Sequence, residues 1–103
     1  MRRPRAPGLP VRVRIPGLLR SYTAGLDCVE IDVAADGADP PRVADGIRAL
    51  DARFPGLRFR IIDERGNIRA HIKLFVDGAQ ARDLSAPLPA GAEVMIVGAL
   101  SGG

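Results

Sequence analysis

Residues 91–103 read GAEVMIVGALSGG, and the position of this stretch decides the fold of the chain. Its AEVMIV portion, residues 92–97, is a short run of strand-forming residues and predicts a final β-strand. Residues 98–103 follow and end on two glycines. Because an extended residue spans roughly 3.3–3.6 Å, this tail reaches about 20 Å past the strand. We therefore expect a folded body that presents a tail of small residues.

Two alternating segments nearer the N-terminus predict a β-hairpin. VRVRI at 11–15 and LDCVEIDV at 26–33 alternate apolar with charged residues, which is typical of half-buried strands. The segment between them includes SYTAG at 21–25, which has turn composition. Across the two strands we expect arginines to meet carboxylates: Arg12 and Arg14 with Glu30 and Asp32.

One helix is predicted next, because apolar residues recur at spacings of four, three and four and form one stripe facing the sheet. These residues are Val43, Ile47, Leu50 and Phe54. We expect Asp39 to cap the helix start, with Pro40 or Pro41 in the first turn. The Pro-Gly pair at 55–56 ends the helix, and Gly46 in its interior disfavours it by roughly 1 kcal/mol.

The second half of the chain reads as strands and turns. LRFRII at 57–62 predicts a strand, DERGN at 63–67 a turn, and IRAHIKLFV at 68–76 the longest strand. VDGAQ at 76–80 predicts a tight turn, followed by a short edge segment. In the longest strand, alternation places one basic and aromatic set of side chains outward: Arg69, His71, Lys73 and Phe75.

This order predicts an α+β fold, with one main helix packed on one face of a mixed sheet of four to five strands. If the first and last strands pair in parallel in the middle of the sheet, the helix makes the usual right-handed crossover. We expect a basic Pro/Arg-rich lead-in at 1–10, one domain at 11–97 and a flexible Gly-Gly tail at 98–103. A chain of 103 residues, 47% of them apolar, fits a single core.

Composition argues against several classes of function. The net charge of +3 comes from the N-terminal end, because residues 1–14 carry five arginines and no acidic residue, while the remainder carries ten basic and twelve acidic residues. With only four aromatic residues for stacking, we expect no nucleic-acid binding. The apolar runs are too short for a membrane span, and a cytoplasmic location is expected. The single cysteine, Cys28, offers no disulfide partner within the chain and no metal-ligand cluster.

The quoted stretches resemble the ubiquitin-like β-grasp sulfur carriers of the MoaD/ThiS group over about residues 11–103. Residues 54–78, FPGLRFRIIDERGNIRAHIKLFVDG, are similar to the longer variant of that family. Residues 84–103, LSAPLPAGAEVMIVGALSGG, are similar to its ending, in which an EV.I strand precedes a terminal Gly-Gly. The chain departs from the family pattern at three positions, none of them in the terminal pair: Asp77, Ala92 and Gly98.

The resemblance implies a carrier and not an enzyme. The carboxylate of Gly103, next to Gly102, would be adenylated by an E1-like enzyme that uses ATP, so the chain itself would bind no cofactor and no metal. A persulfide or sulfide source would then convert the adenylate into a thiocarboxylate. The acceptor would be the large subunit of molybdopterin synthase, in molybdenum cofactor synthesis. Alternatively, it would be a cysteine-synthase-like enzyme that makes cysteine, or an enzyme that makes thiazole or another sulfur metabolite.

Partner enzymes need a docking surface, and glycines without Cβ atoms can enter a narrow channel. We expect the partner-binding residues to be Phe75, His71, Lys73, Met95, Leu100 and Ser101, and Arg12 joins them if it lies on the same face of the sheet. The chain shows no recognisable set of nucleophile, base and orienting residue. The alternative is a β-grasp adaptor that binds partners without covalent chemistry, which would tolerate the loss of Gly102 and Gly103.

Overall fold

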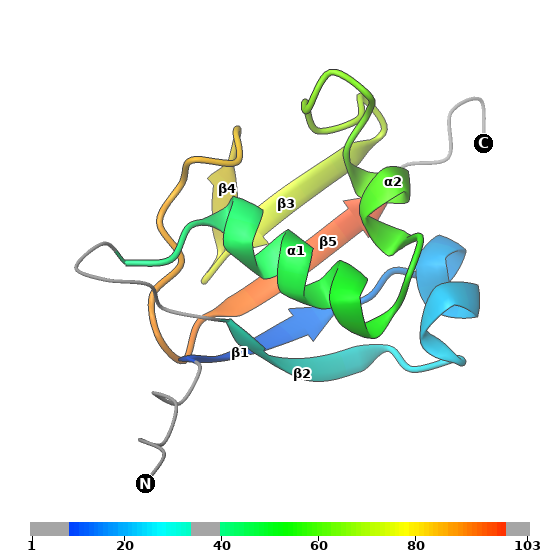
Figure 1. Ribbon diagram of the computed structural model, residues 1–103, viewed down its shortest axis with the longest axis horizontal. Helices are drawn as coiled ribbons and strands as arrows, with labels where there is room; N and C mark the ends of the chain where they lie inside the picture. Colours follow the sequence, from blue (N-terminus) through cyan, green and yellow to red (C-terminus); the bar gives the residue numbers. More distant parts are fainter. Residues whose placement is uncertain (1–8, 34–39, 99–103) are drawn as a thin grey trace, which may run out of the picture.

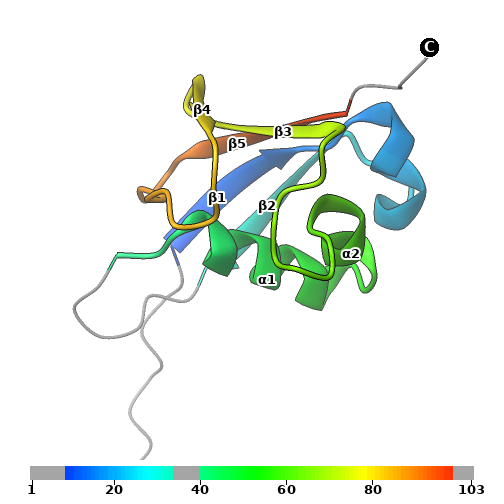
Figure 2. The same cartoon turned by 90° about the horizontal axis from the view of Figure 1, so that it is seen from above.

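A five-stranded mixed sheet forms one layer of the molecule, and helices cover one of its faces (Figures 1 and 2). The computed structural model describes residues 9–33 and 40–98. The strands are β1 (Leu9–Arg14), β2 (Cys28–Val33), β3 (Ile72–Val76), β4 (Ala79–Ala81) and β5 (Glu93–Gly98). The helices are the 3-10 helix η1 (Gly17–Thr23) and the α-helices α1 (Val43–Arg53) and α2 (Leu57–Ile61).

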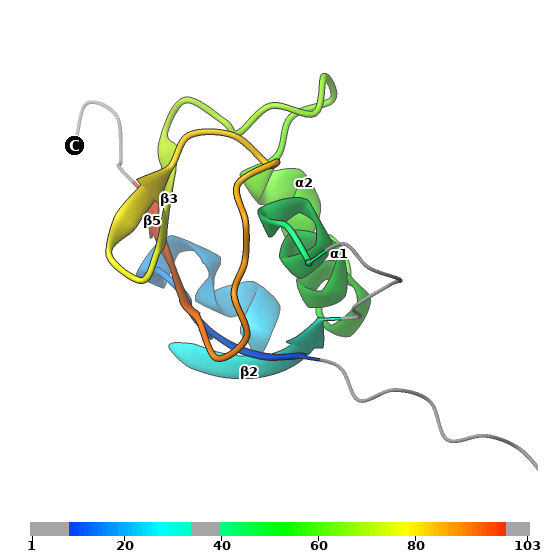
Figure 3. The ribbon, with the colours of Figure 1, turned by 90° about the vertical axis from the view of Figure 1, so that its left-hand side faces the viewer.

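The strand order is β2-β1-β5-β3-β4, so the last strand lies in the centre of the sheet. β5 pairs in parallel with β1 and antiparallel with β3, and the two outer pairs are antiparallel. Seen edge-on, the sheet and the helices form two layers (Figure 3). This architecture is the ubiquitin-like β-grasp, which confirms the predicted fold class and the parallel pairing of the first and last strands.

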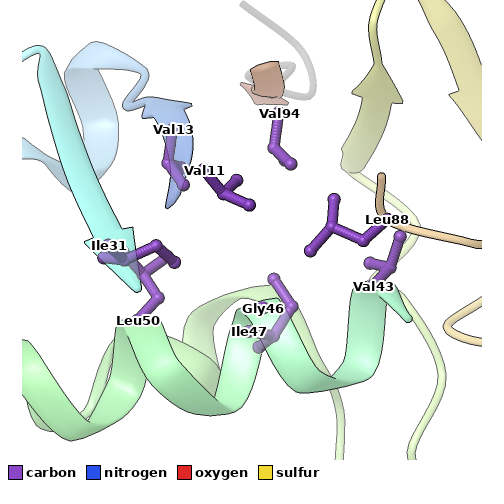
Figure 4. Close-up of a pocket in the computed structure, with 9 residues that line it drawn as sticks. All are labelled: Val11, Val13, Ile31, Val43, Gly46, Ile47, Leu50, Leu88 and Val94. Atoms are coloured by element: carbon purple, nitrogen blue, oxygen red, sulfur yellow. The ribbon is translucent and has the colours of Figure 1, made fainter. Parts of the chain in front are cut away.

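The core lies between the sheet and α1, where every second strand residue points toward the helix. The predicted stripe on α1 is buried at Val43, Ile47 and Leu50. Figure 4 shows this contact from inside: apolar side chains surround a void of about 10 Å³. Gly46 and Leu88 both line this void and lie side by side, since a Cβ built on Gly46 would be 2.8 Å from Leu88 Cδ2.

The predicted hairpin of β1 and β2 is confirmed, but only one of its two ion pairs forms as expected. Arg12 lies opposite Glu30, and their charged groups are 3.8 Å apart. Arg14 lies opposite Cys28, so its guanidinium pairs instead with Glu93 on β5, at 3.6 Å. The expected partner, Asp32, lies opposite Pro10, because the antiparallel register places it at the far end of the hairpin.

The segment 57–62 was expected to be a strand, and this expectation is wrong: residues 57–61 form α2. Leu57 and Ile61 are both fully buried, as the i, i+4 spacing of a helix allows, whereas Phe59 is 58% exposed. Asp51, in the last turn of α1, accepts hydrogen bonds from the N–H groups of Gly56 and Arg58. These bonds satisfy amide groups at the start of α2 that have no partner within the helix.

The helix α1 begins later than the sequence indicates. Its first residue is Val43, and the N–H of Arg42 donates to the Asp45 carboxylate at 2.8 Å. Pro41 precedes the helix and is buried, with its carbonyl accepting the N–H of Leu88. Asp39, the expected cap, lies outside the described residues. The segment before β2 also differs from expectation, because it forms η1 and not only a turn.

The strand expected at 68–76 is also shorter than predicted, because β3 begins only at Ile72. Ile68 forms an isolated bridge with Ile62, and the N–H of Ile72 donates to the carbonyl of Arg69, which closes a turn. The predicted turn at 63–67 is confirmed by a hydrogen bond from the N–H of Asp63 to the carbonyl of Asn67.

The tight turn predicted between β3 and β4 is confirmed at Asp77 and Gly78. Both have positive φ, 50° and 87°, as the two central residues of a type I′ hairpin turn require. Asp77 also ties this hairpin to β5, because its carboxylate accepts the N–H of Glu93 at 2.9 Å. The edge of the sheet is thereby fixed relative to its central strand.

Candidate functional site

The central strand β5 leads toward the C-terminal glycines. Its last residue, Gly98, lies opposite Ile72 of β3. Leu18 of η1 packs directly over Gly98, where a Cβ would lie only 2.1 Å from Leu18 Cδ2. Only glycine allows this close approach of η1 to the end of the strand. The expected site residues Leu100, Ser101, Gly102 and Gly103 lie outside the described residues.

On the outer face of the sheet, opposite the helices, residues from three adjacent strands form a row. Met95 of β5 lies between Arg14 of β1 and Phe75 of β3, with register pairing on both sides. Met95 is 39% exposed and Phe75 is half-buried. In the next row, Val97 lies opposite Lys73. The structure therefore brings together three of the predicted partner-binding residues, Phe75, Lys73 and Met95, in what we call the outer-face patch.

Val97 belongs to the same patch, although it is not among the partner-binding residues predicted from the sequence. Its side chain is 37% exposed on the same side of β5 as Met95. The alternation of the final strand could have predicted this position, because residues two apart on a strand share a face and Val97 is two residues after Met95. Taken with Val97, the patch has an apolar centre with Lys73 and Arg14 at its margins, as is typical of protein interfaces.

The two arginines of β1, Arg12 and Arg14, lie on this face, and each forms an ion pair with a glutamate. Arg12 pairs with Glu30, and Arg14 with Glu93. All four side chains are at least 40% exposed, so each pair adds at most about 1 kcal/mol to stability. Arg12 lies one row away from Met95, because its partner on β5 is Glu93. Arg12 therefore lies on the same face of the sheet as Met95.

His71 does not lie in the rows of the sheet. It precedes β3 in a turn, where it is exposed and lines a groove together with Leu18 and Phe59. The first residue of β3 lies opposite Gly98, so this groove is at the end of the sheet where β5 ends. His71 is therefore separated from the outer-face patch but close to the end of the central strand.

Residues 9–33 and 40–98 form neither a metal-ligand cluster nor a membrane-spanning helix. No three His, Cys, Asp or Glu side chains gather there to hold a metal ion. Within those ranges no helix has the length and apolar character needed to cross a bilayer. Cys28 is half-buried, on the outer side of β2 and opposite Arg14.

Comparisons with known proteins give a consistent picture of the fold. No protein-family description and no curated protein sequence matches the chain. Among solved structures, CysO in the Amycolatopsis orientalis BexX/CysO complex matches with a TM-score of 0.76 and 27% identity, over 90% of this chain and 99% of that one. CysO of Mycobacterium tuberculosis, described as an antigen, matches with a TM-score of 0.74 and 25% identity, over 87% and 99%. SAMP1 from Haloferax volcanii matches with a TM-score of 0.75 and 26% identity, over 91% and 99%.

These neighbours are ubiquitin-like proteins of the MoaD/ThiS kind. Each aligns with nearly its whole length, so the likeness covers the complete β-grasp. The identities of 25–27% are low, and the agreement lies mainly in the order and packing of the elements. The chain has the ubiquitin-like β-grasp fold and resembles the sulfur carriers of the MoaD/ThiS group.

Proposed function

We propose that the chain is a sulfur carrier that works through the carboxylate of Gly103. The observation that carries this proposal is the likeness of nearly the whole chain to CysO and SAMP1, combined with the Gly-Gly pair at 102–103. Gly103 is five residues beyond Gly98, the last residue of the central strand. Five extended residues span at most about 18 Å, long enough to reach an active site recessed in a partner enzyme.

The chemistry needs an activation step, because a carboxylate is a poor electrophile. An E1-like enzyme would supply ATP: a carboxylate oxygen of Gly103 attacks the α-phosphorus, pyrophosphate leaves, and an acyl-adenylate forms. Sulfide then attacks the acyl carbon and AMP leaves, so that sulfur replaces one oxygen. With a persulfide donor, the attack gives an acyl disulfide, which a thiol reduces to the thiocarboxylate. The chain is consumed and regenerated as a co-substrate.

Docking of the partner enzymes is assigned to the outer-face patch. Its central side chains, Phe75, Met95 and Val97, offer the apolar contact that interface hot spots need, and Lys73 adds a cation at the margin. In the same proposal, Leu100 and Ser101 enter the partner enzyme together with the Gly-Gly pair. The patch lies on the strands that flank and include β5, so an enzyme that holds it is in reach of Gly103.

Two acceptor enzymes are candidates for the sulfur. The sequence resemblance favours the large subunit of molybdopterin synthase, in the synthesis of the molybdenum cofactor. The likeness to two proteins named CysO, with the PGL segment at 55–57, favours a cysteine-synthase-like enzyme as the second candidate. The two acceptors release different products, so a transfer assay with each purified enzyme distinguishes them.

The experiment that tests the carrier role is an intact-mass measurement. The chain is incubated with an E1-like adenylating enzyme, ATP and sulfide, and the expected product has one oxygen replaced by sulfur. A variant lacking Gly103 is the matched control, since it keeps the whole described domain and is expected to stay unmodified. If the intact, folded chain gains no sulfur with any competent activating enzyme, the carrier proposal is wrong and the non-covalent adaptor takes its place.

A further inference from the structure

A groove of about 560 Å³ opens between η1 and α2, beside the end of β5. In Figure 1 these two helices lie at the end of the sheet toward which β5 points. Leu18, which packs over Gly98, forms part of its wall. The groove is lined by Leu18, Leu19, Ser21, Tyr22, Phe59, Arg60, Glu64, Arg69 and His71.

Two arginines in this groove are held in fixed positions. Arg60 donates from Nε to the hydroxyl of Tyr22, and its guanidinium lies 5.6 Å from the centre of that ring. Arg69 donates from Nε to the carbonyl of Phe59 at 2.8 Å and lies 4.9 Å from the centre of the Phe59 ring. Each arginine is thus oriented by one hydrogen bond and one stacked ring. Ordering a long side chain normally opposes binding, and here much of that cost is already met within the fold.

The terminal amino groups of both guanidiniums remain available for a ligand. Neither arginine forms an ion pair with any carboxylate of the described residues. A guanidinium has five N–H donors, and only Nε is used in each case. Two oriented guanidinium groups without a counter-ion fit carboxylate oxygens, which they bind through paired hydrogen bonds.

The charge around the groove favours an anion. Residues 57–71 carry four arginines against Asp63 and Glu64. Asp63 is turned into its own loop, where its carboxylate accepts the N–H groups of Arg65 and Asn67. Glu64 lines the groove and is the acidic side chain that opposes an anionic ligand there.

The wall of the groove fits a protein segment better than a small metabolite. Phe59 is 58% exposed and Leu18 is 38% exposed, so aromatic and aliphatic surface stands next to the two arginines. Arginine beside aromatic side chains is the composition of interface hot spots. A typical interface covers about 800 Å² on each partner, so an enzyme that holds the end of β5 while it acts on the tail also reaches this groove.

We propose that the groove formed by Arg60 and Arg69 binds an acidic segment of the enzyme that adenylates Gly103. An Asp or Glu side chain of that enzyme pairs with the guanidinium groups, and Phe59 and Leu18 cover the pair. This inference rests on the proposed function. It assigns a second contact, on the helical side of the strand end, in addition to the outer-face patch.

The first test uses the full chain and a hexaglutamate peptide as the probe, without any enzyme. In an NMR titration, the peptide is expected to shift the Nε–H signals of Arg60 and Arg69 and the amides of Phe59 and Leu18. The affinity is expected to fall steeply between low and high salt, because exposed charges are screened. Shifts spread evenly over the arginines of the whole surface would overturn the proposal. Tighter binding of ATP at the same residues would also overturn it, in favour of a phosphate site.

Variants of the chain show which residues bind the peptide in this titration. Arg60→Gln combined with Arg69→Gln is expected to weaken peptide binding about tenfold or more, since hydrogen bonds to charged groups are lost. Arg48→Gln is the matched control, because Arg48 is exposed on α1 and its loss leaves the groove intact. Glu64→Gln removes the opposing charge and is expected to strengthen binding. Equal affinity for all of these variants contradicts the proposal, and thermal melting of each variant verifies that it is folded.

The second test measures kcat/KM for adenylation of the chain by its activating enzyme. The Arg60→Gln, Arg69→Gln double variant is expected to lower kcat/KM about tenfold through KM, while Arg48→Gln leaves it unchanged. If the wild-type chain is thiocarboxylated and the double variant reacts equally well, the groove proposal is wrong and the carrier function stands. If the wild-type chain is never thiocarboxylated, the carrier function is wrong, and so is the assignment of the groove to an activating enzyme.

Discussion

Phe75 and Met95 lie directly opposite each other on β3 and β5, in the centre of the outer face of the sheet. This pair exists because β5, the last strand of the chain, inserts between β1 and β3. The same insertion brings the end of β5 against Leu18 of η1. The position of β5 between β1 and β3 therefore determines both the apolar patch and the place where the strand ends.

If the pair of Phe75 and Met95 is the docking centre, its removal weakens partner binding without unfolding the domain. Phe75→Ala and Met95→Ala are each expected to reduce the affinity for the activating enzyme by about 2 kcal/mol or more, as hot-spot residues do. Calorimetric titration measures the affinity, and thermal melting verifies the fold. Arg48→Ala on α1 is the control, expected to leave the affinity unchanged. Unaltered binding by both patch variants would move the docking site elsewhere.

Because α2 is a helix, alanine substitutions at Leu57 and Phe59 are expected to lower the free energy of unfolding by different amounts. Leu57→Ala is expected to lower the free energy of unfolding by about 2–5 kcal/mol, because Leu57 is fully buried. Phe59→Ala is expected to cost about 1 kcal/mol or less, because that side chain is mostly exposed and loses chiefly its stacking with Arg69. Denaturant unfolding measures both. Similar large costs at the two positions would indicate a strand, in which residues two apart share a face.

Gly46 and Leu88, which both line the void shown in Figure 4, are expected to be energetically coupled because they are in close contact. Leu88→Ala alone should cost about 2–5 kcal/mol. Gly46→Ala improves helix propensity by about 1 kcal/mol, but in the wild-type chain its new methyl group meets Leu88. In the Leu88→Ala background that contact is absent, so the gain should appear in full. A double-mutant cycle by chemical denaturation measures the coupling, and strictly additive effects would show that the two residues do not interact.

Acid is expected to loosen the turn at 63–67. Hydrogen bonds from the amides of Asn67 and Arg65 hold the pKa of Asp63 below its ordinary value, although partial desolvation opposes them. Because the pKa is lower in the folded state, the ionised carboxylate stabilises the fold above the unfolded-state pKa of roughly 3.9, and this contribution disappears as the pH falls through the folded-state pKa. The stability difference between wild type and Asp63→Ala should therefore shrink on acidification below about pH 4. Unfolding curves at several pH values test this, and a constant difference would contradict it.

The fold class was predictable because hydrophobic periodicity identified most of the elements. The alternation in β1, β2 and β5 and the stripe on α1 follow from geometry that each segment imposes on itself. The strand prediction for 57–61 is wrong because Leu57 and Ile61 fit both a strand with period two and a helix with an i, i+4 pair. Its helical state is supported by the carboxylate of Asp51, whose hydrogen bonds to the α2 start cannot be seen in the local pattern.

The sequence by itself determined the fold class with its main helix and first and last strands, the outward position of Phe75 and Lys73, and the Gly-Gly pair on which the proposed chemistry rests. Only the tertiary structure decided which residues meet. It placed Arg14 beside Glu93, Leu18 over Gly98, and Arg60 and Arg69 on one groove. Where the local pattern identifies the right element, it also gives the face on which a side chain lies, because that depends on the period of the backbone. Contacts between distant segments depend on strand register and helix packing, which the whole core sets together.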